Sequence, residues 1–249
     1  MSYYDRALEM KDELVANRRY LHENAEVGLT LPKTRAFIEE KLREYGIEPK
    51  RCGEGVTGLI GKGGKVLLLR ADMDALAMPE ESGLPFASKD PKAAHCCGHD
   101  MHATMLLGAA KMLKEHESEL KGTVKLMFQP AEEIFEGSHD MIEAGLLENP
   151  KVDAALMIHV MAGMHFPAGT VIVSAPGVSA PAADYFEVKV QGKGCHGSMP
   201  NTGVDPLTAA AHILIALQEI HARELALGDR AVLTIGTMNG GTAANVIPD

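Results

Sequence analysis

The hydrophobic positions of the first 46 residues recur with the period of an α-helix. Those of the first predicted helix share one face: Leu8, Leu14, Val15 and Leu21. Those of the second also share one face: Phe37, Ile38, Leu42 and Tyr45. Gly46 follows directly and is a typical residue for the end of a helix. The pattern therefore predicts two amphipathic helices ahead of the first strand.

The pattern then changes to that of β-strands. The segment VTGLIGKGGKVLLLRAD contains two apolar, β-rich runs on either side of Gly63 and Gly64. Two such runs around a pair of glycines predict a β-hairpin. Its second strand would end at Asp72 and Asp74.

Predicted helices and strands alternate over the next 90 or so residues. A helix is expected from about residue 99, then the strand GTVKLMFQ, a helix near 137–146 and the strand VDAALMIHV. This alternation predicts an α/β fold, whose parallel strands place chemistry at their carboxyl ends. Five polar residues follow such ends and are expected to converge: Asp72, Asp74, Glu132, Glu133 and His159.

A second domain is predicted after the segment APGVSAPAA at 175–183, which has the composition of a linker. Beyond it, 184–192 alternates as a strand, a helix begins at Asp205 and Pro206, and 231–241 resembles another strand. We therefore assign residues 1–181 to an α/β domain and 182–249 to the beginning of a smaller one.

Composition and charge argue against several classes of protein. A formal net charge of -10 over 249 residues, without a stripe of Lys and Arg, argues against a nucleic-acid partner. No apolar run approaches the roughly 20 residues of a membrane span. The charged N-terminal segment lacks the apolar stretch of a secretory signal, so we expect a cytoplasmic protein. The four cysteines are expected to be reduced thiols, because they are too few and too scattered for a disulfide framework.

The segment AAHCCGHDMH, residues 93–102, concentrates cysteine, histidine and aspartate at the start of the third predicted helix. Thiolate, imidazole and carboxylate are the usual ligands of zinc and its neighbours. A chemically sensible ligand set is Cys97, His99, Glu133 and His159. Short Cys and His clusters are also found simply buried in cores, and it is the strand-end Glu133 and His159 that favour a metal site.

The adjacent Glu132 and Glu133 must point in different directions from one turn. One can then bind a metal while the other faces a water as general base, although a lone pair of glutamates is more often a solvated turn. His102 is expected in the core or behind the ligands, and Asp100 is expected to cap the helix or orient an imidazole. Four histidines in polar helical stretches are expected to be solvated: His22, His116, His139 and His221.

Six motifs in order resemble the metal-dependent aminoacylase and carboxypeptidase family. They are LRADMDAL, HCCGHDMH, FQPAEE, IHV, GKGCHGSMP and GGTAANVIPD. Within that family they are most similar to the amidohydrolase branch of hippurate hydrolases, N-acyl-amino-acid hydrolases and auxin-conjugate hydrolases. The resemblance implies a catalytic zinc-peptidase-like sheet with flanking helices, interrupted by an α+β, ferredoxin-like lid domain that commonly mediates dimerisation.

The resemblance also implies roles for individual residues. Two divalent metal ions, Zn²⁺ or Mn²⁺, would be held by Cys97, His99, Glu133 and His159, with Asp74, Asp100 and His102 behind them. Glu132 would be the general base, and the substrate an N-acyl amino acid. In the lid, His196 would reach the reacting carbonyl, often from the partner subunit of a homodimer, and Asn245 would help to hold the substrate.

The sequence departs from the family pattern at Ala77, where a proline is usual, and at Asn201, where a histidine is frequent. The family also has a late metal-ligand histidine, and no histidine follows Asn245. We therefore expect the chain to be an N-terminal portion that holds at most one metal tightly and does not itself hydrolyse amides. Two rival interpretations stay open: a non-catalytic protein with one structural zinc, and an enzyme that uses Cys97 as nucleophile.

Overall fold

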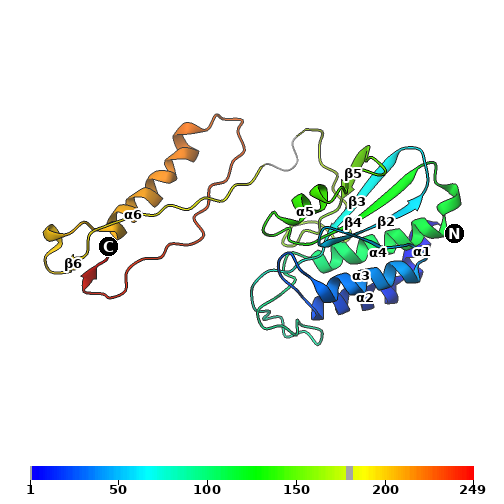
Figure 1. Ribbon diagram of the computed structural model, residues 1–249, viewed down its shortest axis with the longest axis horizontal. Coiled ribbons are helices and arrows are strands. Elements are labelled where there is room, and N and C mark those ends of the chain that lie inside the picture. The colour runs from blue at the N-terminus through cyan, green and yellow to red at the C-terminus, as the bar shows by residue number, and fades with distance from the viewer. Residues whose placement is uncertain (1, 178–181) are drawn as a thin grey trace. The chain divides into compact units, whose positions relative to one another are not determined.

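The computed structural model describes residues 2–177 and 182–249. The chain divides into two compact units, Met1–His165 and Phe166–Asp249 (Figure 1). The predicted boundary after residue 181, and four of the nine residues of the predicted linker, fall on residues 178–181, which lie outside the described residues. That boundary therefore stays a prediction.

A five-stranded mixed sheet with the order β1-β2-β4-β3-β5 forms the centre of the first unit. Its strands are β1 (Lys50–Cys52), β2 (Gly55–Gly61), β3 (Val66–Asp72), β4 (Thr123–Gln129) and β5 (Ala154–Met157). β3 is parallel to both of its neighbours, β4 and β5. The β1–β2 and β2–β4 pairs are antiparallel. The expected parallel arrangement thus holds for the three strands that lead to the predicted site.

The predicted hairpin around Gly63 and Gly64 is wrong. β2 and β3 do not pair with each other, because β4 lies between them. An apolar alternation shows which face of a strand is buried, but it does not select the neighbouring strand. β4 is buried at every position, as expected for a strand in the middle of a covered sheet.

Helices cover both faces of this sheet (Figure 1). They are α1 (Tyr3–Glu9), α2 (Lys11–Glu23), α3 (Pro32–Glu44), α4 (His99–Glu115) and α5 (Gly137–Glu143), with a 3-10 turn at Glu117–Glu119. The larger core joins α2, α3 and α4 to one face, and includes Ile38, Leu107 and Phe128. On the other face, Met141 of α5 packs with Leu68 and Met127.

The N-terminal helices differ in detail from the sequence prediction. The first predicted helix is divided at Met10 into α1 and α2, and of its predicted apolar face Leu21 is buried whereas Leu8 and Val15 are exposed. The second predicted helix is α3, with Phe37, Ile38 and Leu42 buried as expected. In the described residues, no helix is both long and apolar enough to cross a membrane.

The second unit contains helix α6 (Pro206–Leu217), a 3-10 turn at Pro200–Thr202 and a π-helical turn at Ile220–Glu224. The predicted cap is confirmed, since the Asp205 carboxylate accepts hydrogen bonds from the N–H groups of Leu207 and Thr208. Two short strands, β6 (Cys195–His196) and β7 (Val246–Ile247), pair antiparallel.

The two longer strands predicted for this unit, at 184–192 and 231–241, do not form. An alternating pattern marks a face, but a strand forms only where a neighbour exchanges backbone hydrogen bonds with it. Within 182–249, the one ladder of the structure is that of β6 with β7.

A buried lysine fastens the loop between α5 and β5 to the centre of the sheet. Lys125 of β4 is 4% exposed, and its Nζ donates to the carbonyl oxygens of Leu146, Glu148 and Pro150, each at 2.8 Å. Burial lowers the pKa of Lys125. Three carbonyl partners satisfy all three donors of the ammonium group, which offsets the cost of burying its charge.

We therefore expect Lys125→Met to lower the free energy of unfolding by about 2–4 kcal/mol, because it leaves three loop carbonyls without their donor. Urea unfolding measures this change. The exposed Lys121→Met, four residues earlier, is the control and should change stability by less than about 0.5 kcal/mol. Equal stability of the two variants would contradict the role given to Lys125.

Candidate metal centre and lid residues

Three parallel strands end at one edge of the sheet and deliver most of the predicted site. β3 ends at Asp72, and its neighbours β4 and β5 end at Gln129 and Met157. Glu132 and Glu133 follow β4, and His159 follows β5. The chain reaches the two glutamates through Ala131, whose φ of 50° lies in the left-handed region that non-glycine residues seldom adopt. Its carbonyl oxygen accepts hydrogen bonds from the N–H groups of Glu136 and Gly137, which closes a tight turn.

The start of α4 meets the segment after β5 at Gly98. Gly98 has a φ of 88°, and a Cβ atom there would lie 2.4 Å from Val160 Cγ2. Glycine is therefore required both by the backbone conformation and by the close approach. As a result Cys97 and His99, which flank Gly98, lie beside His159.

His99 lies at the centre of the site and is fully buried. Its Nδ1 donates to the backbone carbonyl of Asp74 at 2.9 Å, and Asp74 Oδ1 lies 3.3 Å from the same nitrogen. A carbonyl oxygen can only accept, so the proton is on Nδ1 and the lone pair of a neutral ring is on Nε2. This Nε2 has no hydrogen-bond partner among the described residues.

Three carboxylates surround that nitrogen. Asp72 Oδ1 and Glu133 Oε1 each lie 3.7 Å from His99 Nε2, and Glu132 Oε2 lies at 3.8 Å. Cys97 Sγ lies 3.5 Å from His159 Nε2. The other ring nitrogen of His159, Nδ1, donates to the carbonyl oxygen of Val160 at 2.7 Å. The donor atoms of Cys97, His99 and His159 lie within 4.8 Å of one another, as do those of His99, Glu132 and Glu133.

The concentrated negative charge changes the acidity of these groups. Burial, together with the charge and hydrogen bond of Glu133, raises the pKa of the Cys97 thiol to about 12. Burial and the charge of Asp72 raise the pKa of Glu132. The effects of Asp74 and Asp72 outweigh burial and raise the pKa of His99. Each raised pKa means that the group holds its proton more tightly. This is expected of metal ligands without a bound metal, because protons then take the place of the cation.

The donor set fits a divalent metal such as Zn²⁺. The available atoms are a sulfur, two imidazole nitrogens with their lone pairs directed into the site, and carboxylate oxygens. The unsatisfied, buried Nε2 of His99 supports this fit most directly, because a buried polar atom without a partner is costly unless a ligand satisfies it. The structure thus brings together all four predicted ligands and Glu132.

Asp72 and His102 form a second layer behind these ligands. His102 Nδ1 donates to Asp72 Oδ1 at 2.5 Å, and its Nε2 accepts the N–H of Val160 at 2.8 Å. Both ring nitrogens are thus engaged, so His102 positions the His159 segment, as expected of a residue behind the ligands. Asp74 is similarly placed, since its Oδ2 accepts the N–H of Glu133 at 3.2 Å.

Arg70 was not among the residues selected from sequence, and Asp72 was expected to converge with the others but was given no role. Arg70 Nη1 lies 2.9 Å from Asp72 Oδ2, and its Nε donates to Gln129 at 2.8 Å. Burial alone would raise the pKa of Asp72, but the hydrogen bond from His102 and the charge of Arg70 lower it. The only sequence signal was the position of Asp72 at the end of a strand.

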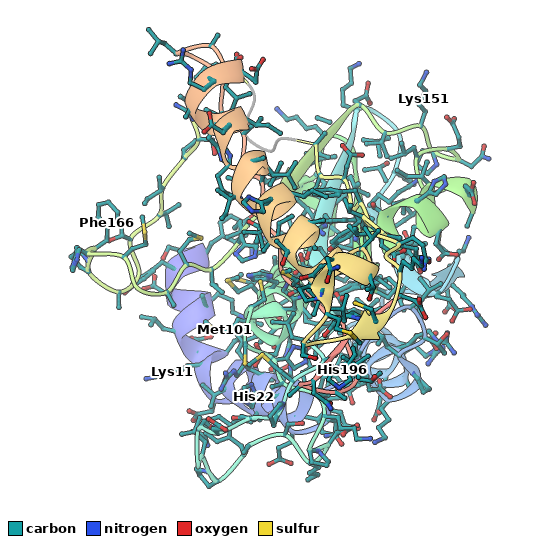
Figure 2. All side chains as sticks on the ribbon, turned by 90° about the vertical axis from the view of Figure 1, so that its left-hand side faces the viewer. Lys11, His22, Met101, Lys151, Phe166 and His196 are labelled. Atoms are coloured by element: carbon teal, nitrogen blue, oxygen red, sulfur yellow. The ribbon has the colours of Figure 1, made fainter. Side chains whose placement is uncertain are left out.

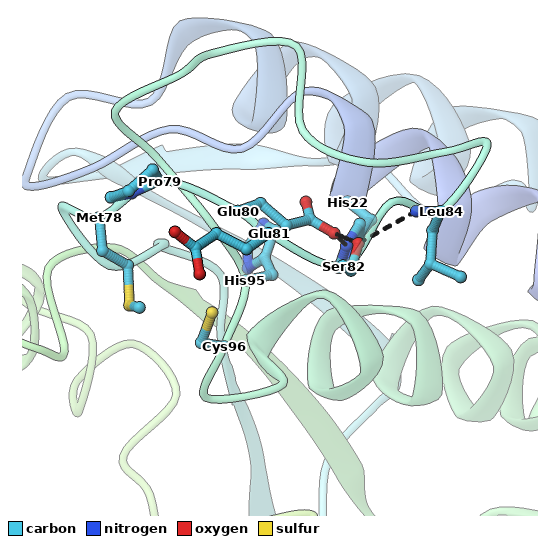
Figure 3. Close-up of a pocket in the computed structure, with 9 residues that line it drawn as sticks. All are labelled: His22, Met78, Pro79, Glu80, Glu81, Ser82, Leu84, His95 and Cys96. Carbon is cyan, nitrogen blue, oxygen red and sulfur yellow. Dashed lines mark hydrogen bonds and ion pairs between the residues drawn. The ribbon is translucent and has the colours of Figure 1, made fainter.

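Asp100 orients an imidazole, but the ring is that of His22 and not that of a predicted ligand. Asp100 Oδ2 lies 2.7 Å from His22 Nδ1 and 2.7 Å from Arg18 Nε. The expectation that His22 is solvated is wrong, because its side chain is only 7% exposed. Its Nε2 faces Glu80 at 3.1 Å (Figure 3). The polar sequence around His22 did not reveal that a loop covers this end of α2.

The covering loop also bounds a pocket of about 460 Å³ (Figure 3). His22, Glu80, His95 and Cys96 contribute to its lining. Burial lowers the pKa of His95 to about 4, so its ring is neutral near pH 7. Burial alone would raise the pKa of Glu80, but hydrogen bonds from the Ser82 hydroxyl, the Ser88 N–H and His22 lower it to about 2. Glu80 is thus an anion that fastens the loop to α2.

In the second unit, the two predicted lid residues lie close together, His196 on β6 and Asn245 in the turn directly before β7. His196 of β6 is opposite Val246 of β7, and the N–H of Gly197 donates to the carbonyl of Asn245 at 2.8 Å. The His196 side chain, which is labelled in Figure 2, is exposed. His196 and Asn245 are far apart in the sequence, and their close approach depends on Gly197. A Cβ atom at Gly197 would lie 2.8 Å from Asn245 O.

Comparison with known proteins identifies the family. The model of peptidase family M20/M25/M40 matches residues 68–247. The chain belongs to this family. It is 43% identical over 241 residues to an IAA-amino acid hydrolase (ILR1-like 4) of Arabidopsis thaliana, covering 96% of this chain and 54% of that protein. It is 41% identical over 244 residues to an N-acetyl-L-cysteine deacetylase of Bacillus subtilis, covering 96% of this chain and 58% of that protein.

A hippurate hydrolase of Campylobacter jejuni is 38% identical over 253 residues, covering 100% of this chain and 65% of that protein. Among solved structures, a putative aminohydrolase from methicillin-resistant Staphylococcus aureus aligns with a TM-score of 0.77 at 34% identity, covering 97% of this chain and 64% of that one. A Bacillus subtilis protein described as a dinuclear metal-binding peptidase of the M20 family aligns with a TM-score of 0.68 at 34% identity. The alignment covers 96% of this chain and 61% of that one. The chain thus spans a little over half of the length of the curated relatives it matches.

We expect Cys97→Ser to weaken the binding of Zn²⁺ by about tenfold or more, because a hydroxyl replaces a thiolate ligand. Competition with a chromogenic chelator measures the affinity. Cys96→Ser is the matched control and should bind as the unaltered protein does. An unchanged affinity in Cys97→Ser would remove Cys97 from the metal site.

We expect Glu80→Gln to change how stability depends on pH. A carboxyl whose folded pKa is lowered stabilises the fold above its unfolded pKa, and this contribution is lost as pH falls through the folded pKa. The unaltered protein should therefore be about 1.5–3 kcal/mol more stable than Glu80→Gln at pH 7, and the difference should shrink between about pH 4.5 and 2. Denaturant unfolding across that range is the measurement, with the exposed Glu81→Gln as control. A difference independent of pH would show that the charge of Glu80 is not responsible.

Proposed function

We propose that the protein is a metal-dependent amide hydrolase that acts on N-acyl amino acids. The observation that supports this most directly is Glu132, a carboxylate beside the four ligands and 3.8 Å from His99 Nε2. A structural zinc site is closed by four protein ligands and has no use for a further carboxylate directed at it. The names of the relatives, which include a deacetylase and a hippurate hydrolase, agree with amide hydrolysis.

Two divalent cations, Zn²⁺ or Mn²⁺, would lower the pKa of a water and polarise the amide carbonyl when bound. Cys97, His99, Glu133 and His159 would hold them. Glu132 would accept the proton of the attacking water on its carboxylate and return it to the leaving amine.

The lid residues complete the proposal. His196 would donate a hydrogen bond to the developing oxyanion, and Asn245 would help to hold the substrate. We also propose that the lid joins two copies of the protein in a homodimer, so that His196 serves the site of the partner. A cytoplasmic location stays a prediction of the sequence.

The high pKa of Cys97 argues against the rival in which this thiol is the nucleophile. A reactive cysteine has a lowered pKa, because its thiolate is the attacking species. Burial and the charge of Glu133 have the opposite effect here and raise the pKa of Cys97 to about 12.

Glu132→Gln in the full-length protein should lower kcat by at least about a hundredfold while its metal content stays the same, because only the base is lost. The assay uses N-acetyl, N-benzoyl and indole-acyl amino acids, and elemental analysis gives the metal content. Glu136→Gln, an exposed residue of the same turn, is the control. Full activity in Glu132→Gln, or metal without hydrolysis in the unaltered protein, would contradict the proposal.

A further inference from the structure

The ring of His196 is held by a residue of its own turn. The backbone N–H of Ser198 donates to His196 Nδ1 at 3.2 Å, and Ser198 Oγ lies 2.8 Å from the same nitrogen. No other hydrogen bond of this ring is formed within the described residues. Its Nε2 therefore has no hydrogen-bond partner among the described residues, and the side chain is exposed.

These contacts determine where the proton of a neutral ring lies. A backbone N–H can only donate, so Nδ1 must be the nitrogen with the lone pair. The hydroxyl of Ser198 then donates to the same atom. The single proton of the neutral imidazole is consequently on Nε2, the other ring nitrogen.

The turn that presents Ser198 is itself fixed on both sides. The N–H of Met199 donates to the carbonyl of His196 at 2.8 Å, and the N–H of Gly197 donates to Asn245 O, directly before β7. Because the close approach of Gly197 to Asn245 leaves no room for a Cβ, the register of the turn against β7 is set. The Ser198 N–H is thereby held toward the ring.

We infer that Ser198 is a positioning residue that keeps His196 in the tautomer with its proton on Nε2. The tautomer follows from the geometry of the turn, and its use in catalysis rests on the function proposed above. An oxyanion must meet an N–H at the ring atom that faces the substrate. The opposite tautomer would present a lone pair to that negative charge and would repel it.

The test measures the tautomer of His196 directly, by long-range nitrogen–proton NMR on the chain labelled at histidine, with His196→Ala to assign the signal. In Ser198→Ala, the ratio of the Nε2–H to the Nδ1–H form should fall by about threefold to tenfold, the effect of losing one ordinary hydrogen bond. Ser198→Thr retains the hydroxyl and should restore the ratio. Thr202→Ala is the control, because that hydroxyl bonds Met199 O in the same turn and does not contact His196.

A kinetic measurement on the full-length protein tests whether the tautomer of His196 matters for catalysis. Ser198→Ala should lower kcat by about the same factor as the tautomer ratio and leave KM nearly unchanged, because the lost interaction serves the transition state. An unchanged tautomer ratio in Ser198→Ala overturns the positioning role of the Ser198 hydroxyl, and a predominant Nδ1–H form in the unaltered protein overturns the tautomer assignment, whatever the activity. A changed ratio with unchanged kcat overturns the catalytic role of Ser198. A changed ratio in a protein that hydrolyses no N-acyl amino acid supports the tautomer assignment and overturns the proposed function.

Discussion

Negative charge gathers around one buried nitrogen at the end of β3. Asp72, Glu132 and Glu133 all lie within 3.8 Å of His99 Nε2, and the lone pair of that nitrogen is directed at them. The ligand oxygens of Glu132 and Glu133 lie within 4.8 Å of each other, and like charges this close repel one another. Burial and this repulsion together raise the pKa values of Cys97 and Glu132. A bound cation would relieve this repulsion, and the surrounding hydrogen bonds serve to hold the donors where such a cation needs them.

Those hydrogen bonds link three parts of the chain. His102 joins Asp72, at the end of β3, to Val160, next to His159. Asp74 contacts both His99 and the backbone of Glu133. On the other side of the α4 terminus, Asp100 connects to Arg18 and His22 of α2. Movement of any one of these segments would therefore displace several donors at once, and this makes the site a property of the whole first unit.

Backbone conformation contributes as much as side-chain chemistry. Gly98 allows α4 to begin against Val160, and the left-handed Ala131 turns the chain after β4, so that the carboxylates of Glu132 and Glu133 both reach His99 Nε2. Unusual backbone conformations of this kind concentrate at functional sites, where the surrounding structure sustains them. In the second unit, Gly197 has a comparable role, because it allows the turn after His196 to lie against the backbone of Asn245.

The sequence by itself determined the chemistry of the site and the fold class. Strand ends followed by Glu132, Glu133 and His159, and a helix that begins in a Cys-Gly-His segment, could be identified because apolar periodicity and ligand type are local properties of the chain. The comparisons confirm the family that these motifs resemble. Only the tertiary structure decided which strands are neighbours, and it placed β4 between the two runs that the Gly63-Gly64 turn appeared to pair. It also decided that His22 is buried, that Arg70 neutralises Asp72, and that the segments 184–192 and 231–241 have no ladder. These outcomes depend on contacts between residues distant in the chain, and a local pattern of polar and apolar positions contains no information about its partner.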